Sequence, residues 1–338
     1  AKQLYVFQRT PSSVDERGNK PTDPEWVKTL EPGWQDYRNT NFCSILAGLP
    51  VDEDLVGDKW TSLFKKLSAL LAGKENSSLS DEGMALMSEI ADYQKMNEIR
   101  GRVASIVGDQ GTAEALKPWY GQWCKRPTFN DEYLPTFNRP NVQLVDTKGK
   151  GVERVTENAV VVDGVEYEVD CLIYATGFEV GTAYTRRSEF EVYGRDGLSL
   201  TDYWSDGMKT YHGLLSNGFP NCFHMGLTQT GLAPNFTYML NGQATHIAHI
   251  MAQMDAREAK SAEPTLEAEA AWVKLLTTPN FMTEYQKICT PGYYNAEGNA
   301  KANHDGFLQG HYPEGGLRFY EMLAQWRAKG DYAGLTVR

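Results

Sequence analysis

The chain has 338 residues, 41% hydrophobic and 23% charged, with a formal net charge of −11 at pH 7. This length exceeds what one hydrophobic core usually supports, so two or more domains are expected. The acidic balance argues against nucleic-acid partners, which need a basic face. No stretch approaches the ~18 apolar residues of a membrane span, and the N-terminus is no signal peptide. The sequence therefore predicts a soluble, cytoplasmic protein with no membrane partner.

The first third of the chain changes from a short strand to a helical region. Residues 4–8, LYVFQ, form a β-rich run that ends before Pro11, because proline cannot continue a central strand. The segment 11–40 is rich in Pro, Gly, Asn and charge, which predicts a long surface connection with short turns. From about 52 to 116, apolar residues recur every three or four positions, which predicts a small helical insertion. Because the chain enters a strand at once, we expect residues to be missing upstream.

Strand character returns at residue 141. The run NVQLVDT and the alternating run GVERVTENAVVVDGVEYEV, with an Asp163-Gly164 turn signal, predict a β-meander. DCLIYATGF, residues 170–178, predicts a continuous strand buried on both faces. Beyond residue 206 we expect a strand in PNCFHMG, a loop in LTQTGLAPN, and helices over 235–254, 265–277 and 315–329. This order of elements is an α/β pattern with an insertion.

The end of the first strand resembles the ribose end of a dinucleotide site. In such a unit the second strand ends at the adenosine ribose, where an acidic residue favours NAD and an Arg accommodates the 2′-phosphate of NADP. Here the strand ends in Gln8-Arg9-Thr10, with no Asp or Glu. Arginine supplies a planar fork for phosphate and threonine a hydroxyl, although a solvated Arg at a strand end is an open alternative. The matching Gly-rich loop would lie upstream, and no G-x-G-x-x-G occurs in the chain.

Lys125 and Arg126 form a fixed pair of positive charges in an acidic chain. A phosphate bound by this protein needs such a local cluster, because the overall charge repels anions. The alternative is a surface ion pair with Asp131 or Glu132. The pair is therefore a candidate phosphate-binding site.

Three further segments carry candidate residues. In DCLIYATGF, Gly177 permits a tight turn and the close approach of a ligand, and Thr176 offers a hydroxyl. Asn235 is a good N-cap for the helix that follows it. His246 and His249 lie three apart on that helix, but no third ligand is evident, so we expect no metal.

These segments together are similar to a Baeyer–Villiger monooxygenase, a class B flavoprotein monooxygenase. The similarity rests on LYVFQRTPSSVDERGNKPTDPEW, GQWCKRPTFNDEYLPTFNRPNVQLVDT, DCLIYATGFEV and TQTGLAPNFTYMLNGQ, in the family's order. It runs over essentially all 338 residues but covers only the C-terminal part of the family's usual length. The resemblance implies two Rossmann-like dinucleotide-binding domains with a helical insertion, the N-terminal part being missing. Residues 1–40 and 117–178 would belong to the NADP-binding domain, 41–116 to the insertion and 179–338 to the FAD-binding domain.

The resemblance also implies a reaction and a set of site residues. The enzyme would use NADPH and O₂ to convert a ketone, by this likeness a bulky cyclic ketone or steroid, to an ester or lactone through a C4a-peroxyflavin. Lys125 would help Arg9 and Thr10 bind the 2′-phosphate, and Arg126 would be catalytic, stabilising the peroxide and the ketone adduct. An upstream FAD-binding part of the same protein would be the partner. The remaining implied contacts to FAD or NADP are Gln8, Thr176, Gly177, Asn235, Phe236 and Tyr293, with Tyr294 an alternative to Tyr293.

Two other functions stay open at this point. A flavin-dependent N- or S-oxygenase shares the Ala-Thr-Gly segment but does not need the Lys125–Arg126 pair. A non-catalytic chain is the alternative of another class, because residues 1–338 contain no Gly-rich fingerprint for FAD. Flavin colour in the purified protein separates a flavoprotein from this last alternative.

Overall fold

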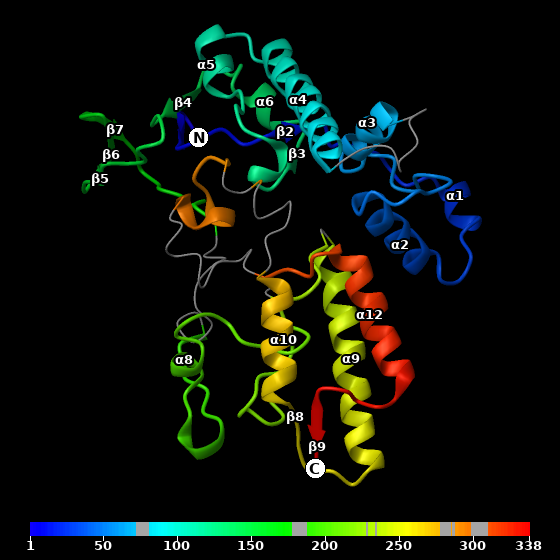
Figure 1. Cartoon of the computed structure of the whole chain (residues 1–338). Coiled ribbons are helices and arrows are strands. Elements are labelled where there is room, and N and C mark those ends of the chain that lie inside the picture. The colour runs from blue at the N-terminus through cyan, green and yellow to red at the C-terminus, as the bar shows by residue number, and fades with distance from the viewer. Residues whose placement is uncertain are drawn as a thin grey trace. The chain divides into compact units, whose positions relative to one another are not determined.

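The structure is a computed structural model that describes residues 1–71, 81–177, 188–227, 229–233, 235–277, 285, 288–298 and 310–338. The chain divides into two compact units (Figure 1). Unit 1 comprises Ala1–Leu30 and Val56–Phe178, and unit 2 comprises Glu31–Leu55 and Glu179–Arg338. No helix in the described ranges is both long and apolar enough to cross a membrane. The division of the chain into parts of an NADP-binding and an FAD-binding domain stays a prediction.

In unit 1, strands far apart in the sequence pair in parallel. The pairs are β1 (Leu4–Gln8) with β4 (Val142–Asp146) and β2 (Val14–Asp15) with β3 (Thr128–Phe129). Parallel strands need a long crossover connection, which here carries helices. The helices of unit 1 are α1 (Pro24–Lys28), α3 (Ser62–Leu71), α4 (Asp81–Ile106), α5 (Gln110–Ala115), the 3-10 helix η2 (Gln122–Cys124) and α6 (Tyr133–Thr136). The predicted strand at 4–8 and the predicted helices within 52–116 are confirmed.

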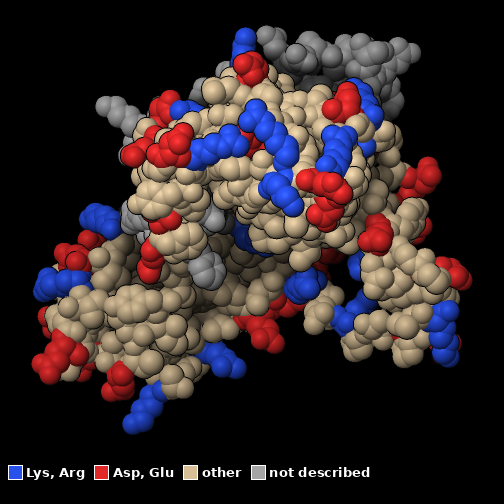
Figure 2. Space-filling model, turned by 90° about the horizontal axis from the view of Figure 1, so that it is seen from below, with Lys and Arg blue, Asp and Glu red and all other residues tan. Residues whose placement is uncertain are grey.

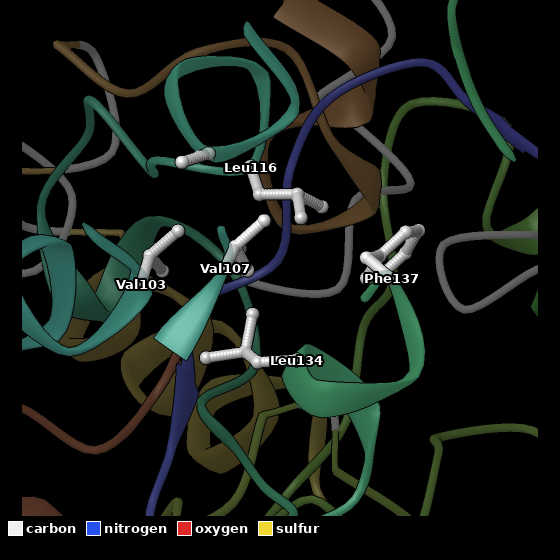
Figure 3. Close-up of a cluster of buried hydrophobic side chains, with 6 residues drawn as sticks. Val103, Val107, Leu116, Leu134 and Phe137 are labelled. Atoms are coloured by element: carbon white, nitrogen blue, oxygen red, sulfur yellow. The ribbon is translucent and has the colours of Figure 1, made fainter. Parts of the chain in front are cut away.

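A buried hydrophobic cluster holds the strand pair β1–β4 against the helices (Figure 3). Val103 of α4, Leu134 of α6 and Phe137 are among its members, and each is at most 8% exposed. Val6 of β1 and Leu144 of β4 pack against them from the sheet side. Full burial of one such side chain contributes about 1.5–3 kcal/mol, so the cluster stabilises the packing of β1 and β4 against the helices.

A β-meander is present after β4, but β4 itself, which we expected to belong to it, pairs in parallel with β1 instead. Its strands are β5 (Arg154–Val155), β6 (Ala159–Val162) and β7 (Val165–Glu168), paired antiparallel. Asp163 and Gly164 join β6 to β7 with positive φ angles of 48° and 76°. Both angles suit a type I′ turn, which explains the Asp-Gly sequence. The hairpin prediction is confirmed.

Unit 2 is mainly helical. Its elements are α2 (Trp34–Leu46), η3 (Arg195–Gly197), α8 (Leu200–Tyr203), α9 (Phe236–Ala256), β8 (Ala262–Pro264), α10 (Leu266–Leu276), η4 (Tyr293–Gly298), α12 (Gly315–Lys329) and β9 (Leu335–Val337). Asn235 and Thr265 cap α9 and α10, because each side chain accepts a hydrogen bond from a backbone N–H of the first turn, at 3.2 Å. The three predicted helices α9, α10 and α12 are confirmed.

A glycine lets α9 and α12 pack closely. A Cβ placed on Gly242 would lie 2.4 Å from a ring carbon of Tyr320. The Tyr320 hydroxyl in turn donates to the carbonyl of Met239, at 3.1 Å. Any side chain at position 242 would therefore push the two helices apart.

Helix α2 is a correction to the predicted surface connection over 11–40. Its sequence, WQDYRNTNFCSIL, has no strong apolar stripe, and its N-cap is Gly33 without a side-chain cap. Cys43 nevertheless packs with Ala233 and Met239 of unit 2 in a buried cluster. Tertiary packing of this kind, rather than local propensity, provides most of a short helix's stability.

Two predicted strands are absent from the described residues, and four short strands that the sequence did not predict, β2, β3, β8 and β9, are present. Residues 171–177 form no strand, with Ile173 80% and Tyr174 75% exposed, and Phe178 lies outside the described residues. Residues 220–226 form no strand either, although the amide of His224 donates to the carbonyl of Leu214 at 2.7 Å. A strand needs a pairing partner, and none of the described strands pairs with either segment. Strand β9 pairs with β8.

Buried histidines in unit 2 are held neutral. An N–H of Arg327 donates to Nδ1 of His246 at 3.3 Å, because a guanidinium can only donate. The proton of His246 therefore sits on Nε2, which donates to Nδ1 of His212, also at 3.3 Å. Burial, and then the Arg327 charge, lowers the pKa of His246 to about 3. Burial lowers the pKa of His224 to about 4 and holds that of His212 well below its ordinary value.

We expect the free energy of unfolding to fall as the pH drops below about 6.5, the pKa of an unfolded histidine. Below that pH each of these histidines binds a proton in the unfolded chain but not in the folded one. The free energy of unfolding therefore falls by about 1.4 kcal/mol per pH unit for each such histidine. The contribution of His224 to this loss stops growing near its folded pKa of about 4, because below that pH the folded protein binds the proton too. His224→Phe keeps a ring near Trp204 but cannot titrate, so it should lose less stability. Urea unfolding at about pH 7.5 and about pH 5 checks this, and equal losses for variant and parent would contradict it.

Candidate cofactor site

The carboxyl ends of β1 and β4 meet at one edge, where α/β sheets commonly bind ligands. Gln8 lies opposite Asp146 in the register. The carbonyl of Gln8 accepts hydrogen bonds from the amide and hydroxyl of Thr147, at 2.8 and 2.9 Å, and that of Arg9 accepts from the amide of Gly149 at 2.9 Å. These hydrogen bonds to the carbonyls of Gln8 and Arg9 thus hold the backbone in place at the end of β1.

The side chains at this strand end differ in exposure. Gln8 is buried, and its amide donates to the carbonyl of Ala115 at 2.9 Å, so it supports the loop. Arg9 is exposed and Thr10 half-buried. Asp146, the carboxylate nearest in the register, accepts from the amide of Lys148 at 3.0 Å. The guanidinium and hydroxyl that the sequence singled out are therefore in reach of a ligand from solvent.

The segment that carries Lys125 runs beside the segment that follows Arg9 and Thr10. The amide and hydroxyl of Thr128 both donate to the carbonyl of Ser13, at 3.1 and 2.8 Å. The hydroxyl of Tyr120 donates to the carbonyl of Pro11 at 2.8 Å. The structure thus brings the two sequence-predicted phosphate-binding segments of unit 1 together.

Lys125 and Arg126 are adjacent in sequence but face different surroundings. Lys125 follows η2 with extended backbone angles, φ −135° and ψ 165°, and successive side chains of extended backbone point to opposite sides. Its ammonium lies 5.5 Å from the ring centroid of Tyr120. Arg126 is exposed and makes no hydrogen bond or ion pair with any residue that the structure describes. The guanidinium is therefore available to a ligand.

Asp131 does not pair with Arg126. Its two carboxylate oxygens accept from the amides of Arg17 and Gly18, each at 2.9 Å, and it forms an ion pair with Arg102 at 3.4 Å. The hydrogen bonds from these amides, the first from Arg17, lower the pKa of Asp131. The ion-pair alternative for Arg126 has no support from this side chain.

Helix α4 is the scaffold that holds both segments. Asp92 accepts a hydrogen bond from the amide of Gln122, the first residue of η2, at 2.9 Å. Lys95, 2% exposed, forms a buried ion pair with Asp15 of β2. Arg102 donates to the carbonyl of Val14 at 3.3 Å. Spacings of three and seven residues place Asp92, Lys95 and Arg102 on one helix face.

The remaining predicted contacts lie elsewhere in the structure. Thr176 and Gly177 are exposed ends of unit 1, and Gly177 has a φ of 87° with nothing within 4 Å of the place of a Cβ. Asn235, the N-cap of α9, also donates to Asn39 at 3.0 Å, and Phe236 is 48% exposed. Tyr293 begins η4, and its side chain lies outside the described residues.

Sequence reasoning missed the residues that hold the site together. Tyr120 lies in the aromatic run PWYGQW and Lys95 in a helix that predicts only an apolar stripe. Neither position carries a motif, and only the folded distances show their partners. Within the described ranges no group of three or more His, Cys, Asp or Glu side chains could hold a metal ion.

Comparison with known proteins shows which proteins the chain is similar to. No family model matches it. It is 46% identical over 341 residues to pentalenolactone D synthase from Streptomyces exfoliatus, covering 100% of this chain and 58% of that protein. It is 46% identical over 338 residues to a Baeyer–Villiger monooxygenase from Stachybotrys chlorohalonatus (100% and 54%). An FAD-binding monooxygenase from Hypomyces subiculosus is 44% identical over 337 residues (99% and 55%).

Solved structures agree with these relatives. A polycyclic ketone monooxygenase from Thermothelomyces thermophila superposes with a TM-score of 0.88 at 37% identity, covering 100% of this chain and 56% of that one. A steroid monooxygenase bound to NADP superposes with a TM-score of 0.70 at 25% identity (100% and 62%). The fold is therefore that of the two-domain flavin- and NADP-dependent monooxygenases. Over its whole length the chain is similar to the C-terminal portion of Baeyer–Villiger monooxygenases, and it spans little more than half the length of these relatives. The predicted resemblance and fold class are confirmed.

We expect Lys95→Met to destabilise the protein strongly. The substitution leaves the Asp15 carboxylate buried without its counter-charge, which typically costs about 3–5 kcal/mol. Adding Asp15→Asn removes the stranded charge and should recover most of the loss. Lys66→Met is the matched control, because it breaks the more exposed Lys66–Glu98 pair of α3 and α4, and such pairs contribute about 1 kcal/mol or less. Urea unfolding of the three variants measures these changes in the free energy of unfolding. Equal losses of stability in Lys95→Met and Lys66→Met would refute the burial argument.

Proposed function

We propose that the protein containing this chain catalyses the NADPH- and O₂-dependent Baeyer–Villiger oxidation of a bulky cyclic ketone to an ester or lactone. The observation that carries the proposal is the exposed guanidinium of Arg126, one residue from the ammonium of Lys125 and on the segment beside Arg9 and Thr10. The names of the relatives support the substrate class, since they include a polycyclic ketone monooxygenase and a steroid monooxygenase. An N- or S-oxygenase would leave Arg126 without a role.

The chemistry of unit 1 fits the 2′-phosphate of NADP. Arg9 offers a planar donor fork, Thr10 a hydroxyl and Lys125 an ammonium, and all three belong to segments that hydrogen bonds tie together. Lys and Arg are intermixed with Asp and Glu among the described residues of the face shown in Figure 2, so that face offers a phosphate no broad basic surface. The steroid monooxygenase with bound NADP supports the same cofactor.

FAD is the second proposed cofactor, since one relative is named an FAD-binding monooxygenase. Bound FAD would supply the electron transfer from NADPH and the activation of O₂. Thr176, Gly177, Asn235 and Phe236 would contact it. Gly177, with its positive φ and open surroundings, fits a close approach. The exposed apolar side chains of Ile173 and Tyr174 fit a covering strand from an upstream FAD-binding part of the same protein.

The proposed role of Arg126 follows from charge. The overall reaction consumes ketone, NADPH, H⁺ and O₂ and yields ester, NADP⁺ and water. Addition to the ketone carbonyl places negative charge on its oxygen, and a guanidinium that stays protonated at any working pH stabilises that charge. A lysine would serve less well, because a desolvated ammonium loses its proton more readily.

Lys125→Ala should raise the KM for NADPH about tenfold to a hundredfold and leave the KM for NADH nearly unchanged. The reason is the loss of one charge-assisted contact to the 2′-phosphate, about 1.5–3 kcal/mol. Lys150→Ala removes an exposed lysine that pairs with Asp163 and serves as the control. Steady-state kinetics of the full-length protein with both cofactors check this, and equal effects on both cofactors would exclude the 2′-phosphate assignment.

Arg126→Ala should separate cofactor oxidation from ester formation. Hydride transfer needs no cation at the ketone, so NADPH consumption should continue, with hydrogen peroxide released in place of product. The rate of ester formation should fall by about 10²–10³. Arg126→Lys should recover little, because an ammonium lacks the planar fork.

Product analysis and peroxide assays on the full-length protein measure the outcome. Arg139→Ala, which removes another exposed arginine of unit 1, is the control and should behave like the parent. A near-normal ester yield from Arg126→Ala would remove this residue from the mechanism.

A further inference from the structure

Tyr120 touches both segments that form the proposed phosphate site. Its hydroxyl donates to the carbonyl of Pro11 at 2.8 Å, across 109 positions of the sequence. Its ring centroid lies 5.5 Å from the ammonium of Lys125. One half-buried side chain therefore contacts the residue after Thr10 and the lysine of the opposite segment.

The Tyr120 hydroxyl makes the middle one of three hydrogen bonds to the backbone of the segment that carries Arg9 and Thr10. Three alternate carbonyls of this segment accept hydrogen bonds: Arg9 from the amide of Gly149, Pro11 from Tyr120, and Ser13 from Thr128. Pro11 has no N–H, so its carbonyl is its one backbone hydrogen-bonding group. Burial raises the pKa of Tyr120, so its hydroxyl stays a donor at any working pH. Without it, this segment would lose the middle one of these three carbonyl hydrogen bonds.

The ring orients the other half of the site. A cation within about 6 Å of an aromatic centroid is attracted to the face of the ring. A lysine side chain otherwise explores many rotamers, and restricting it before binding lowers the entropy lost when a phosphate arrives. The ring thus favours conformations of Lys125 that point toward the Pro11 side.

We propose that Tyr120 is a positioning residue that holds Lys125 and the Arg9–Thr10 segment at the spacing of one phosphate group. The hydroxyl sets the place of the Arg9–Thr10 segment and the ring sets the place of the ammonium. The inference rests on the proposed function and deepens it, because it names a specificity determinant for the 2′-phosphate that does not itself touch the cofactor.

The test is the binding of 2′,5′-ADP and of 5′-ADP to the full-length protein by isothermal titration calorimetry. Tyr120→Phe removes only the hydroxyl and should weaken 2′,5′-ADP binding about two- to tenfold while leaving 5′-ADP unchanged. Tyr120→Leu also removes the ring and should weaken 2′,5′-ADP further. In a Lys125→Met background, the additional effect of Tyr120→Leu over Tyr120→Phe should disappear, because the ring then has no cation to orient.

Tyr93→Phe is the matched control. The ring of Tyr93 also faces a cation, with its centroid 5.8 Å from the guanidinium of Arg100, but it is 63% exposed and lies on α4. It should leave both affinities unchanged. Thermal unfolding and near-UV circular dichroism confirm that each variant is folded, and Tyr120→Phe, which keeps the ring, gives the deciding measurement should Tyr120→Leu be unstable.

The outcomes separate this inference from the proposed function. A parent protein that binds 2′,5′-ADP no better than 5′-ADP overturns both. A parent that prefers 2′,5′-ADP, with a folded Tyr120→Phe variant that keeps the full preference, overturns only the role of Tyr120. Equal weakening of the two ligands in Tyr120→Phe also overturns it, because that result indicates a general structural role.

Discussion

The buried ion pair between Lys95 and Asp15 is the constraint on which the candidate site depends. Two charges removed from water are stable only when each satisfies the other, so the pair fixes α4 and β2 at one distance. Strand β2 pairs with β3, and a single residue, Pro127, separates the Lys125–Arg126 dipeptide from the start of β3. The ion pair therefore helps to determine the positions of Lys125 and Arg126, because it fixes β2 and β2 pairs with β3. A looser apolar contact would hold the same elements with less directional control.

The side chains of Lys125 and Arg126 point in different directions because side chains alternate between the two sides of an extended backbone. Because Lys125 is extended, it and its neighbour project to opposite sides, one toward the ring of Tyr120 and the other to solvent. A helical turn at this position would have spread the two charges over one face, as neighbours about 100° apart. The proline after Arg126 prevents that turn, because it disfavours helical angles in the residue before it. The local sequence thus allows two adjacent charges to serve two different tasks.

Sequence reasoning succeeded where the signal is local and failed where it depends on distant partners. The Asp163-Gly164 turn and the Asn235 cap depend on a few neighbouring residues, and both are present in the fold. Helix α2 has no apolar stripe of its own and exists through contacts made by Cys43. The run around Ile173 predicts a strand from its composition, yet a strand requires a neighbour that these residues do not pair with. Arg9, Thr10 and Lys125 were predicted as one site through the resemblance, but the contacts of Tyr120 and Lys95 that bring them together carry no sequence signal.

The proposed phosphate site lies in a chain whose formal net charge is −11 at pH 7. At long range an acidic protein repels a phosphorylated cofactor, and salt screens that repulsion beyond about 8 Å at physiological ionic strength. Attraction must therefore come from contacts within a few ångströms, where small displacements of a cation matter most. Carbonyls tied at Arg9, Pro11 and Ser13 and an ammonium set over an aromatic ring keep those displacements small before the ligand arrives. In an acidic chain, preorganisation of the proposed site would take the place of a basic surface, and it would favour only a ligand with a phosphate at the right position.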